Sequence, residues 1–378
     1  MAPQRPLPGA SGARGIELAA MPGTDTRREI RACLDYLAEH DLADALVRES
    51  APTPRLALAP GYLGRWTPEG DTLALAARLA LPPQASGWAL EREILVALLS
   101  SPVPYAFPSA QELASAVRIR CNTVEAARRT ALAFDTDAAE RPWDYWSYDE
   151  ETGFTLREGK ALIPALMAAI DPQRTGNRYA FSCYRASEYV MLVGIAQELA
   201  LSNPALLAQL EARWRTRAIQ SGLFHDVFLR EYGSNSQPFP MRHYTPGDRV
   251  WFRNPDPLSS DVAGYEGSWV IYLGGGLFAN FWKDEAPFTL SGKCVEVYHW
   301  RHAVVGDDPG SMTIDEAIVE ARVRRSMADP QELDAILRLM QRYRLPAGST
   351  PAGGCIDTTR ESPRWVCPRT SELDIPAA

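Results

Sequence analysis

The sequence lacks the features that mark metal-binding, membrane-spanning or nucleic-acid-binding proteins. Its six cysteines form no Cys-x-x-Cys pair, and its five histidines do not join them at metal-ligand spacing, so no metal site is expected. The longest apolar run, residues 189–196, is too short to cross a bilayer. No run of lysine and arginine occurs, and the net charge of −8 argues against nucleic acid or an anionic membrane as a partner.

The first residues, MAPQRPLPGASGARG, contain no apolar segment of the kind that a Sec signal requires. We therefore expect a cytoplasmic protein, with export by a dedicated secretion system left open. Reduced thiols are the expectation in that compartment. Cys355 and Cys367, which flank a Gly/Thr/Ser/Pro-rich stretch, are the two cysteines that oxidising conditions would allow to pair.

Three parts are predicted from the change of pattern along the 378 residues. Residues 1–105 are expected to hold a disordered Pro/Gly/Ala-rich start and a helical extension, with helices over residues 27–50 and 88–99. Residues 106–303 are expected to form the core. Residues 304–378 are expected to form a pair of helices and a tail.

The core is predicted to place helices before strands. Ser109 and Glu112 match a capping box at the start of a pair of helices. Three later segments, RVWFRN, GSWVIYLGGGLFANFW and KCVEVYHW, have the pattern of strands joined by Gly- and Pro-bearing turns. The expected fold is therefore α+β, with an antiparallel sheet following the helices.

Cys183 is the candidate nucleophile because it falls at the start of a predicted helix, after the turn YAFS. Unpaired backbone N–H groups and the positive end of the helix dipole favour a thiolate at such a position. The alternative interpretation is a small, inert core cysteine.

Four stretches of the core occur in an informative order. They are SAQELASAVRIRCNTVEAA, YAFSC ahead of a long apolar helix, GDRVWFRNPDP and GSWVIYLGGGLFAN. Together they resemble the spore-coat type of bacterial protein-glutamine γ-glutamyltransferase (transglutaminase), a small member of the NlpC/P60-like, papain-like superfamily. The resemblance implies a papain-like core in which the cysteine-bearing helix packs on the antiparallel sheet. It covers neither terminal extension.

The resemblance also implies a reaction. Cys183 would attack the side-chain amide of a glutamine, release ammonia and hold the acyl group as a thioester until an amine takes it. Backbone N–H groups at the helix start would hold the oxyanion. No cofactor is implied. The implied partners are a protein or peptide bearing glutamine and an amine acceptor, while the extensions are candidate surfaces for a second copy of the chain or another protein.

The acids and bases of the family are missing from the matching positions. Ser268 stands where the transglutaminases carry a glutamate and NlpC/P60 enzymes a histidine, and Ser182 replaces a second acid just before the cysteine. Asn280 stands at a later strand position that often carries histidine. A serine hydroxyl cannot shuttle a proton at neutral pH as a carboxylate or imidazole does.

Two other residues are candidates for the base. Strand alternation would place Glu266 on the same face as Ser268, and His243 lies ahead of the first strand. A solvated turn glutamate and a loop histidine are the structural alternatives. Tyr265 and Trp269 are candidates for lining a substrate groove, or for packing alone.

Three functions follow as hypotheses. The first is an active acyltransferase whose base comes from another part of the chain. The second is a hydrolytic activity, such as glutamine deamidation or amide cleavage by an effector or toxin. The third is a degenerate member of the group that binds a partner without chemistry.

Overall fold

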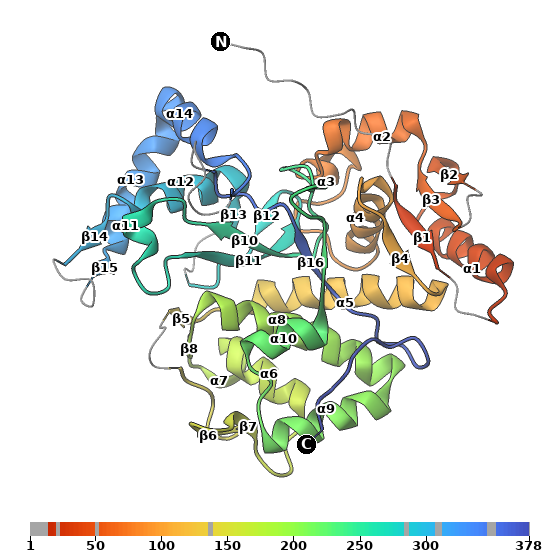
Figure 1. Ribbon diagram of the computed structural model, residues 1–378, viewed down its shortest axis with the longest axis horizontal. Helices are drawn as coiled ribbons and strands as arrows, with labels where there is room; N and C mark the ends of the chain where they lie inside the picture. Colours follow the sequence, from red (N-terminus) through yellow and green to blue (C-terminus); the bar gives the residue numbers. More distant parts are fainter. Residues whose placement is uncertain are drawn as a thin grey trace.

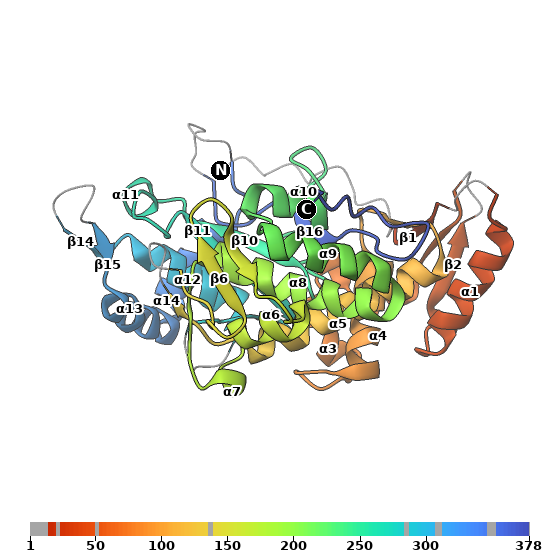
Figure 2. The ribbon, with the colours of Figure 1, turned by 90° about the horizontal axis from the view of Figure 1, so that it is seen from below.

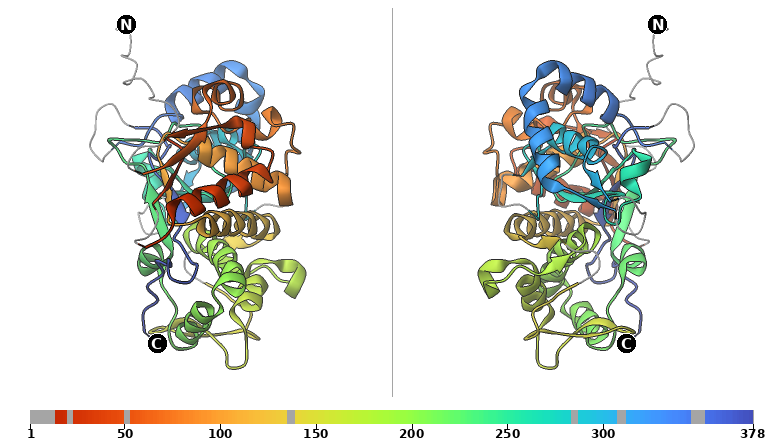
Figure 3. Two further views of the ribbon diagram at one scale, coloured as in Figure 1. Left: turned by 90° about the vertical axis from the view of Figure 1, so that its right-hand side faces the viewer. Right: turned by 90° about the vertical axis from the view of Figure 1, so that its left-hand side faces the viewer.

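A layer of helices joins two sheets in the computed structural model (Figure 1). Helix α5 (Ala110–Arg129) crosses the middle of the view and packs against strands of both sheets. Figure 2 shows α1 (Thr26–Ala38) and the two-stranded ribbon of β14 (Val304–Val305) and β15 (Thr313–Ile314) at opposite ends of the molecule, and Figure 3 views the molecule from these two ends. The structure describes residues 14–19, 23–49, 53–134, 139–282, 287–306, 312–345 and 353–377.

The N-terminal part, predicted to be helical, contains a four-stranded sheet. Its order is β2-β3-β1-β4, antiparallel except for the parallel pair of β1 with β4. The helix predicted for residues 27–50 ends at Ala38, because Leu46–Glu49 pairs with a neighbouring strand and that pairing overrides local helix preference. The strands are β1 (Ile16–Leu18), β2 (Leu46–Glu49), β3 (Arg55–Leu58) and β4 (Tyr105–Phe107).

Helix α4 (Gly87–Ser100) confirms the helix predicted for residues 88–99 and is buried along most of its length. The predicted disordered start falls largely outside the described residues. The shorter elements of this part are η1 (Ala43–Ala45), α2 (Pro60–Trp66), η2 (Pro68–Gly70) and α3 (Leu75–Arg78).

Helix α5 is continuous where a pair of helices was predicted. The Ser109 hydroxyl accepts the backbone N–H of Glu112 at 3.2 Å, which confirms the predicted helix start. The Glu112 carboxylate does not return to Ser109, however, and instead accepts the backbone N–H of Cys367 at 2.8 Å. Only half of the capping box therefore forms, and its acid holds the C-terminal segment against α5.

Helix α8 (Cys183–Ser202) packs on α5 and is buried on nearly every side. Two strands of this layer form a hairpin, with Trp146 opposite Leu156. The remaining elements of this layer are β5 (Ala133–Phe134), β6 (Trp146–Asp149), β7 (Gly153–Leu156), α6 (Leu162–Ile170), α7 (Pro172–Thr175), β8 (Ala180–Phe181), α9 (Pro204–Thr216) and α10 (Ser221–Phe228).

The larger sheet has six strands in the order β13-β12-β11-β10-β16-β9, and each neighbouring pair is antiparallel. Strand β16 comes from the segment predicted to be a tail and lies between β10 and β9. The strands are β9 (Leu229–Tyr232), β10 (Arg249–Arg253), β11 (Gly267–Gly274), β12 (Leu277–Phe278), β13 (Phe288–Thr289) and β16 (Arg360–Pro363), with α11 (Pro257–Ser260) between β10 and β11.

The third predicted strand, KCVEVYHW, is wrong, because these residues lie in helix α12 (Leu290–Trp300). The Thr289 hydroxyl accepts the backbone N–H of Gly292 at 3.0 Å and starts this helix. Two helices follow as predicted, α13 (Glu316–Ala328) and α14 (Pro330–Met340). The Asp315 side chain caps α13 by accepting the backbone N–H groups of Ala317 and Ile318.

The predicted α+β fold is confirmed, with Cys183 at the N-terminus of a helix that packs against β11 of an antiparallel sheet. The division at residues 105 and 303 stays a prediction, and two elements cross it. Strand β4 pairs with β1, and β16 joins the core sheet.

Candidate active site

Cys183 is the first residue of α8. The Ser182 hydroxyl accepts the backbone N–H of Arg185 at 3.4 Å and caps the helix. Ser182, the residue just before the cysteine, thus helps to start this helix. The Cys183 side chain is partly buried, and its backbone position is the one expected for a nucleophile at a helix start.

The start of β11 lies against the thiol. The Sγ of Cys183 is 4.0 Å from the backbone oxygen of Gly267. A Cβ at Gly267 would lie 2.2 Å from Nε1 of Trp251 and 2.7 Å from the oxygen of Phe252, so only glycine fits here. This close approach of β10 and β11 brings the sheet up to the cysteine.

Opposing influences set the acidity of the thiol. Burial raises the pKa of Cys183, and the negative charge of Glu266 raises it further. A backbone hydrogen bond from Trp269 and the positive charges of Lys293 and Arg249 lower it. The two nearby cations therefore partly compensate for the desolvation of a thiolate.

Two cavities meet at Cys183. The first, of about 510 Å³, is called the Arg249 cavity here, and the second, of about 470 Å³, the Lys293 cavity. Cys183, Gly264 and Gly267 line both. A molecule in either cavity can therefore approach the thiol.

Aromatic rings hold the arginine of the Arg249 cavity. The Arg249 guanidinium lies 3.8 Å from the ring centre of Trp269 and 4.5 Å from that of Tyr184. Trp251 stacks beside Trp269 with a ring-centre distance of 5.9 Å. Arg249 also donates to the carboxylate of Glu361 at 2.5 Å. In this cavity, aromatic rings thus surround the buried guanidinium of Arg249.

The Lys293 cavity combines aromatic rings with carboxylates. The Tyr265 hydroxyl donates to Glu316 at 2.8 Å, and its ring meets Trp300 edge-on at 5.1 Å. Lys293 donates to Glu296 at 2.8 Å, from the next turn of α12. This cavity can therefore interact with a cationic or amine-bearing group.

A sequence profile described as protein-glutamine gamma-glutamyltransferase matches residues 76–363. The chain belongs to this family. A protein-glutamine gamma-glutamyltransferase of Halalkalibacterium halodurans is 24% identical over 194 residues, which are 50% of this chain and 62% of that relative. A solved structure, the transglutaminase from Geobacillus stearothermophilus without its C-terminal extension, is 22% identical with a TM-score of 0.38, and the match covers 57% of this chain and 98% of that one.

The candidate residues at the start of β11 divide between the two cavities. Ser268 lies in the Lys293 cavity beside Tyr265, and Glu266 and Trp269 lie in the Arg249 cavity. Glu266 thus does not share a face with Ser268. The physical reason is that Glu266 precedes the first residue of β11, so strand alternation does not apply to it.

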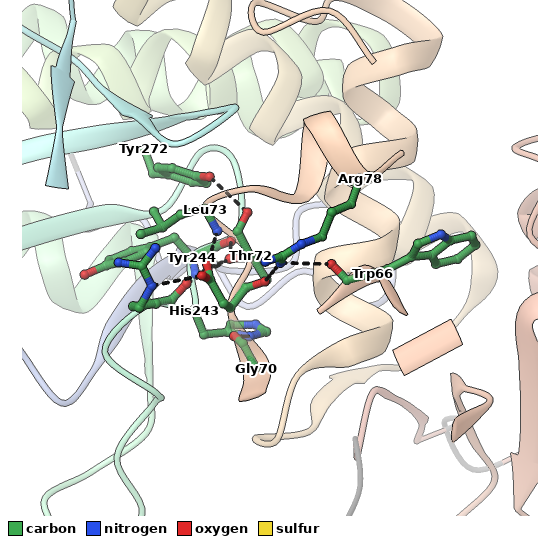
Figure 4. A network of polar contacts seen from close by, with 10 residues as sticks. Trp66, Gly70, Thr72, Leu73, Arg78, His243, Tyr244 and Tyr272 are labelled. Carbon is green, nitrogen blue, oxygen red and sulfur yellow. Dashed lines mark hydrogen bonds and ion pairs between the residues drawn. The ribbon is translucent and has the colours of Figure 1, made fainter. Parts of the chain in front are cut away.

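His243, the other predicted base, is not at the site. It is fully buried, and its Nδ1 lies 3.2 Å from the backbone oxygen of Gly70, in the contact between the N-terminal part and the loop ahead of β10 (Figure 4). Its neighbours Thr72 and Tyr244 are linked by a hydrogen bond of 2.7 Å. Burial, with the charge of Arg360, lowers the pKa of His243 to about 3. Its role is to join two parts of the chain.

Asn280 also lies outside the two cavities that meet at Cys183. It lines a separate cavity of about 420 Å³ with residues such as Arg128, and its side-chain oxygen accepts the backbone N–H of Trp282 at 3.4 Å. The strand β12 ends at Phe278, before this residue, so Asn280 is not held in the sheet.

Sequence reasoning missed Lys293 and Glu296, because they were read as part of a strand. Their spacing of three residues is the signal for an ion pair on one helix face, once the segment is recognised as a helix. Glu361 was missed because its segment resembled a tail. Among the described residues, no three or more His, Cys, Asp or Glu side chains are grouped to hold a metal ion, and no helix there is long and apolar enough to span a bilayer.

Proposed function

We propose that the chain transfers the acyl group of a protein-bound glutamine to a primary amine through a thioester on Cys183. The position of Cys183 carries this proposal, because it is the first residue of α8 and lines both cavities. One nucleophile can therefore be reached from either cavity. Family membership supports glutamine as the acyl donor, although the chain spans 62% of the length of its curated relative.

The reaction has two halves. In the first, the Cys183 sulfur forms a bond to the glutamine side-chain carbon, the carbon–nitrogen bond breaks, and ammonia leaves with the thiol proton. In the second, the amine nitrogen forms a bond to the same carbon and returns a proton to the departing sulfur. The backbone N–H groups at the start of α8 are suited to hold the oxyanion in each half.

The lining of the Lys293 cavity favours binding of the amine substrate. It holds the rings of Tyr265 and Trp300 and three carboxylates, those of Glu296, Glu316 and Glu320, against the two cations Lys293 and Arg178. Carboxylates and aromatic faces attract an alkylammonium group before it loses its proton. The glutamine then enters through the Arg249 cavity.

Two products distinguish this function from the alternatives. With a glutamine-rich protein and a fluorescent alkylamine, we expect both ammonia release and covalent amine incorporation, and Cys183→Ala should abolish both. Cys121→Ala is the matched control, because Cys121 is the other partly buried thiol. Ammonia without incorporation would indicate a deamidase instead. Neither product, in a folded protein, would favour a binding protein without chemistry.

A further inference from the structure

The Lys293 cavity contains a buried ion pair that comes from α12 and not from the segment around Cys183. Lys293 donates to Glu296 at 2.8 Å, and the two side chains are 4% and 11% exposed. Both side chains line the cavity with Cys183 and Ser268. The pair therefore shares this cavity with Ser268, the position at which the resemblance implies an acid.

The local structure fixes the pair in place. Both residues lie on one face of α12, three positions apart, and the Lys293 ammonium sits 4.2 Å from the ring centre of Phe288. Removing two charges from water is costly, so a buried pair is weak evidence for a contribution to stability. A function at the thiol is the alternative that the cavity itself suggests.

Other charges face the same space from several elements. The positive charge of Lys293 lowers the pKa of Cys183, as does that of Arg249 from the other cavity, while Glu266 raises it. Arg178, Glu316 and Glu320 also line the Lys293 cavity, and each of them has interaction partners of its own. A test of the pair must therefore compare variants of its two members.

We propose that Glu296 exchanges protons with Cys183 and that Lys293 holds Glu296 and the thiolate in place, so that α12 supplies what the strand residue Ser268 does not. This proposal rests on the proposed function for its turnover step. It gives a role to Lys293 and Glu296, which lie outside the four stretches that resemble the transglutaminases.

The proton steps balance as follows. The Glu296 carboxylate accepts the Cys183 thiol proton as the carbon–sulfur bond forms. It then gives that proton to the departing NH₂ group as the carbon–nitrogen bond breaks, which releases ammonia. In the second half, Glu296 accepts a proton from the attacking amine and returns it to the cysteine sulfur as the thioester opens. Lys293 stays protonated throughout.

The first experiment needs no substrate. The rate of Cys183 alkylation by iodoacetamide is followed against pH in the full chain, with peptide mapping. Lys293→Met should move the inflection to higher pH, because an unpaired carboxylate then faces the thiolate. Glu296→Gln should move it to lower pH, because an unpaired ammonium remains. Glu151→Gln is the control, since it removes a charge from an exposed pair with Arg217 and should leave the inflection unchanged.

The second experiment measures turnover. Glu296→Gln should lower kcat for ammonia release and for amine incorporation by about 10²- to 10⁴-fold, although its thiol is more acidic. A purely structural role of Glu296 would not lower kcat while making the Cys183 thiol more acidic. Glu296→Asp, which keeps the charge and withdraws the carboxylate, should keep the alkylation inflection and still lower kcat. It serves as the second variant if Glu296→Gln does not fold.

The outcomes separate this inference from the proposed function. If the folded variants keep the wild-type inflection and kcat within about twofold, the pair does not act on Cys183 and the inference is wrong. If native protein shows no turnover, the proposed function fails, and the alkylation profile alone decides whether the pair is coupled to the thiol. Unchanged inflections in that case overturn the inference as well.

Discussion

Arg249 of β10 and Glu361 of β16 lie opposite one another in the sheet and are joined by a hydrogen bond of 2.5 Å between guanidinium and carboxylate. Arg249 is 1% exposed, and Glu361 comes from the C-terminal region of the chain. The last strand therefore completes the wall of the Arg249 cavity. The terminal region is part of the site, although its sequence resembles a tail.

Glu361→Ala is expected to lower the free energy of unfolding by about 3 kcal/mol, because it leaves the Arg249 charge buried without its carboxylate. Urea denaturation followed by tryptophan fluorescence measures this change. Asp334→Ala is the control, because Asp334 pairs with Arg338 on an exposed face of α14 and should matter little. Equal effects of the two variants would show that the Arg249 pair is not the cause.

Gly267→Ala is expected to distort the site. The added Cβ would lie 2.2 Å from Nε1 of Trp251, so β10 and β11 must separate beside Cys183. We expect slower alkylation of Cys183 and a loss of stability of about 1–3 kcal/mol. Gly222→Ala in α10 is the matched control, because nothing lies within 4 Å of its Cβ position. Wild-type alkylation in Gly267→Ala would contradict the close packing.

The start of α8 could be predicted from the sequence because local rules govern it. A serine cap, a cysteine and a long apolar helix follow one another in YAFSC and the residues after it. The α12 segment could not, since Val295, Val297 and Tyr298 favour strands locally. There, packing of α12 against α13, α14 and β10 decides the structure. Lys293 and Glu296 can be recognised as an ion pair only once this segment is known to be a helix.

Pairings between strands that lie far apart in the sequence could not be predicted either. Strand β16 reaches the sheet through contacts between residues more than one hundred positions apart, such as Glu361 with Arg249 and with Glu231. Composition around residues 353–367 suggested a loose tail, because it contains little apolar material. Its charged side chains are instead held by partners contributed by other segments, which a single sequence does not reveal.

Cys294, and not Cys367, is the partner expected for Cys355 on oxidation. The Sγ atoms of Cys294 and Cys355 lie 3.5 Å apart, whereas Cys367 lies against α5 near Gln111. Diamide, which takes up the two hydrogens that the thiols lose, should therefore link Cys294 to Cys355. Peptide mapping without reductant identifies the pair. A Cys355–Cys367 link in folded protein would contradict this arrangement.

Glu93 is expected to make stability depend on pH. Burial raises its pKa from 4.5 to about 7, and its carboxylate accepts the backbone N–H of Gly275 at 2.8 Å. Because the folded state holds this proton more tightly than the unfolded state, stability should fall as pH rises from about 4.5 to about 7. The contribution is of the order of 3 kcal/mol at most.

The comparison with Glu93→Gln isolates this effect, because other titrating groups are shared by both proteins. The glutamine oxygen can still accept the Gly275 N–H. The difference in free energy of unfolding between variant and wild type should therefore grow in favour of the variant between pH 5 and about pH 7.5. A difference that stays constant over this range would show that Glu93 does not titrate there.

The assignment of one cavity to each substrate predicts a split in the Michaelis constants. Tyr265 lines the Lys293 cavity and Trp269 lines the Arg249 cavity, and Cys183 lines both. Tyr265→Leu should raise KM for the amine by about three- to thirtyfold, because it removes a ring that faces an alkylammonium group. Trp269→Leu should raise KM for the glutamine protein and leave that of the amine unchanged. Tyr148→Leu, at an exposed ring of the β6/β7 hairpin, is the control and should change neither constant. If both site variants raise the same KM, the two substrates do not approach Cys183 from separate cavities.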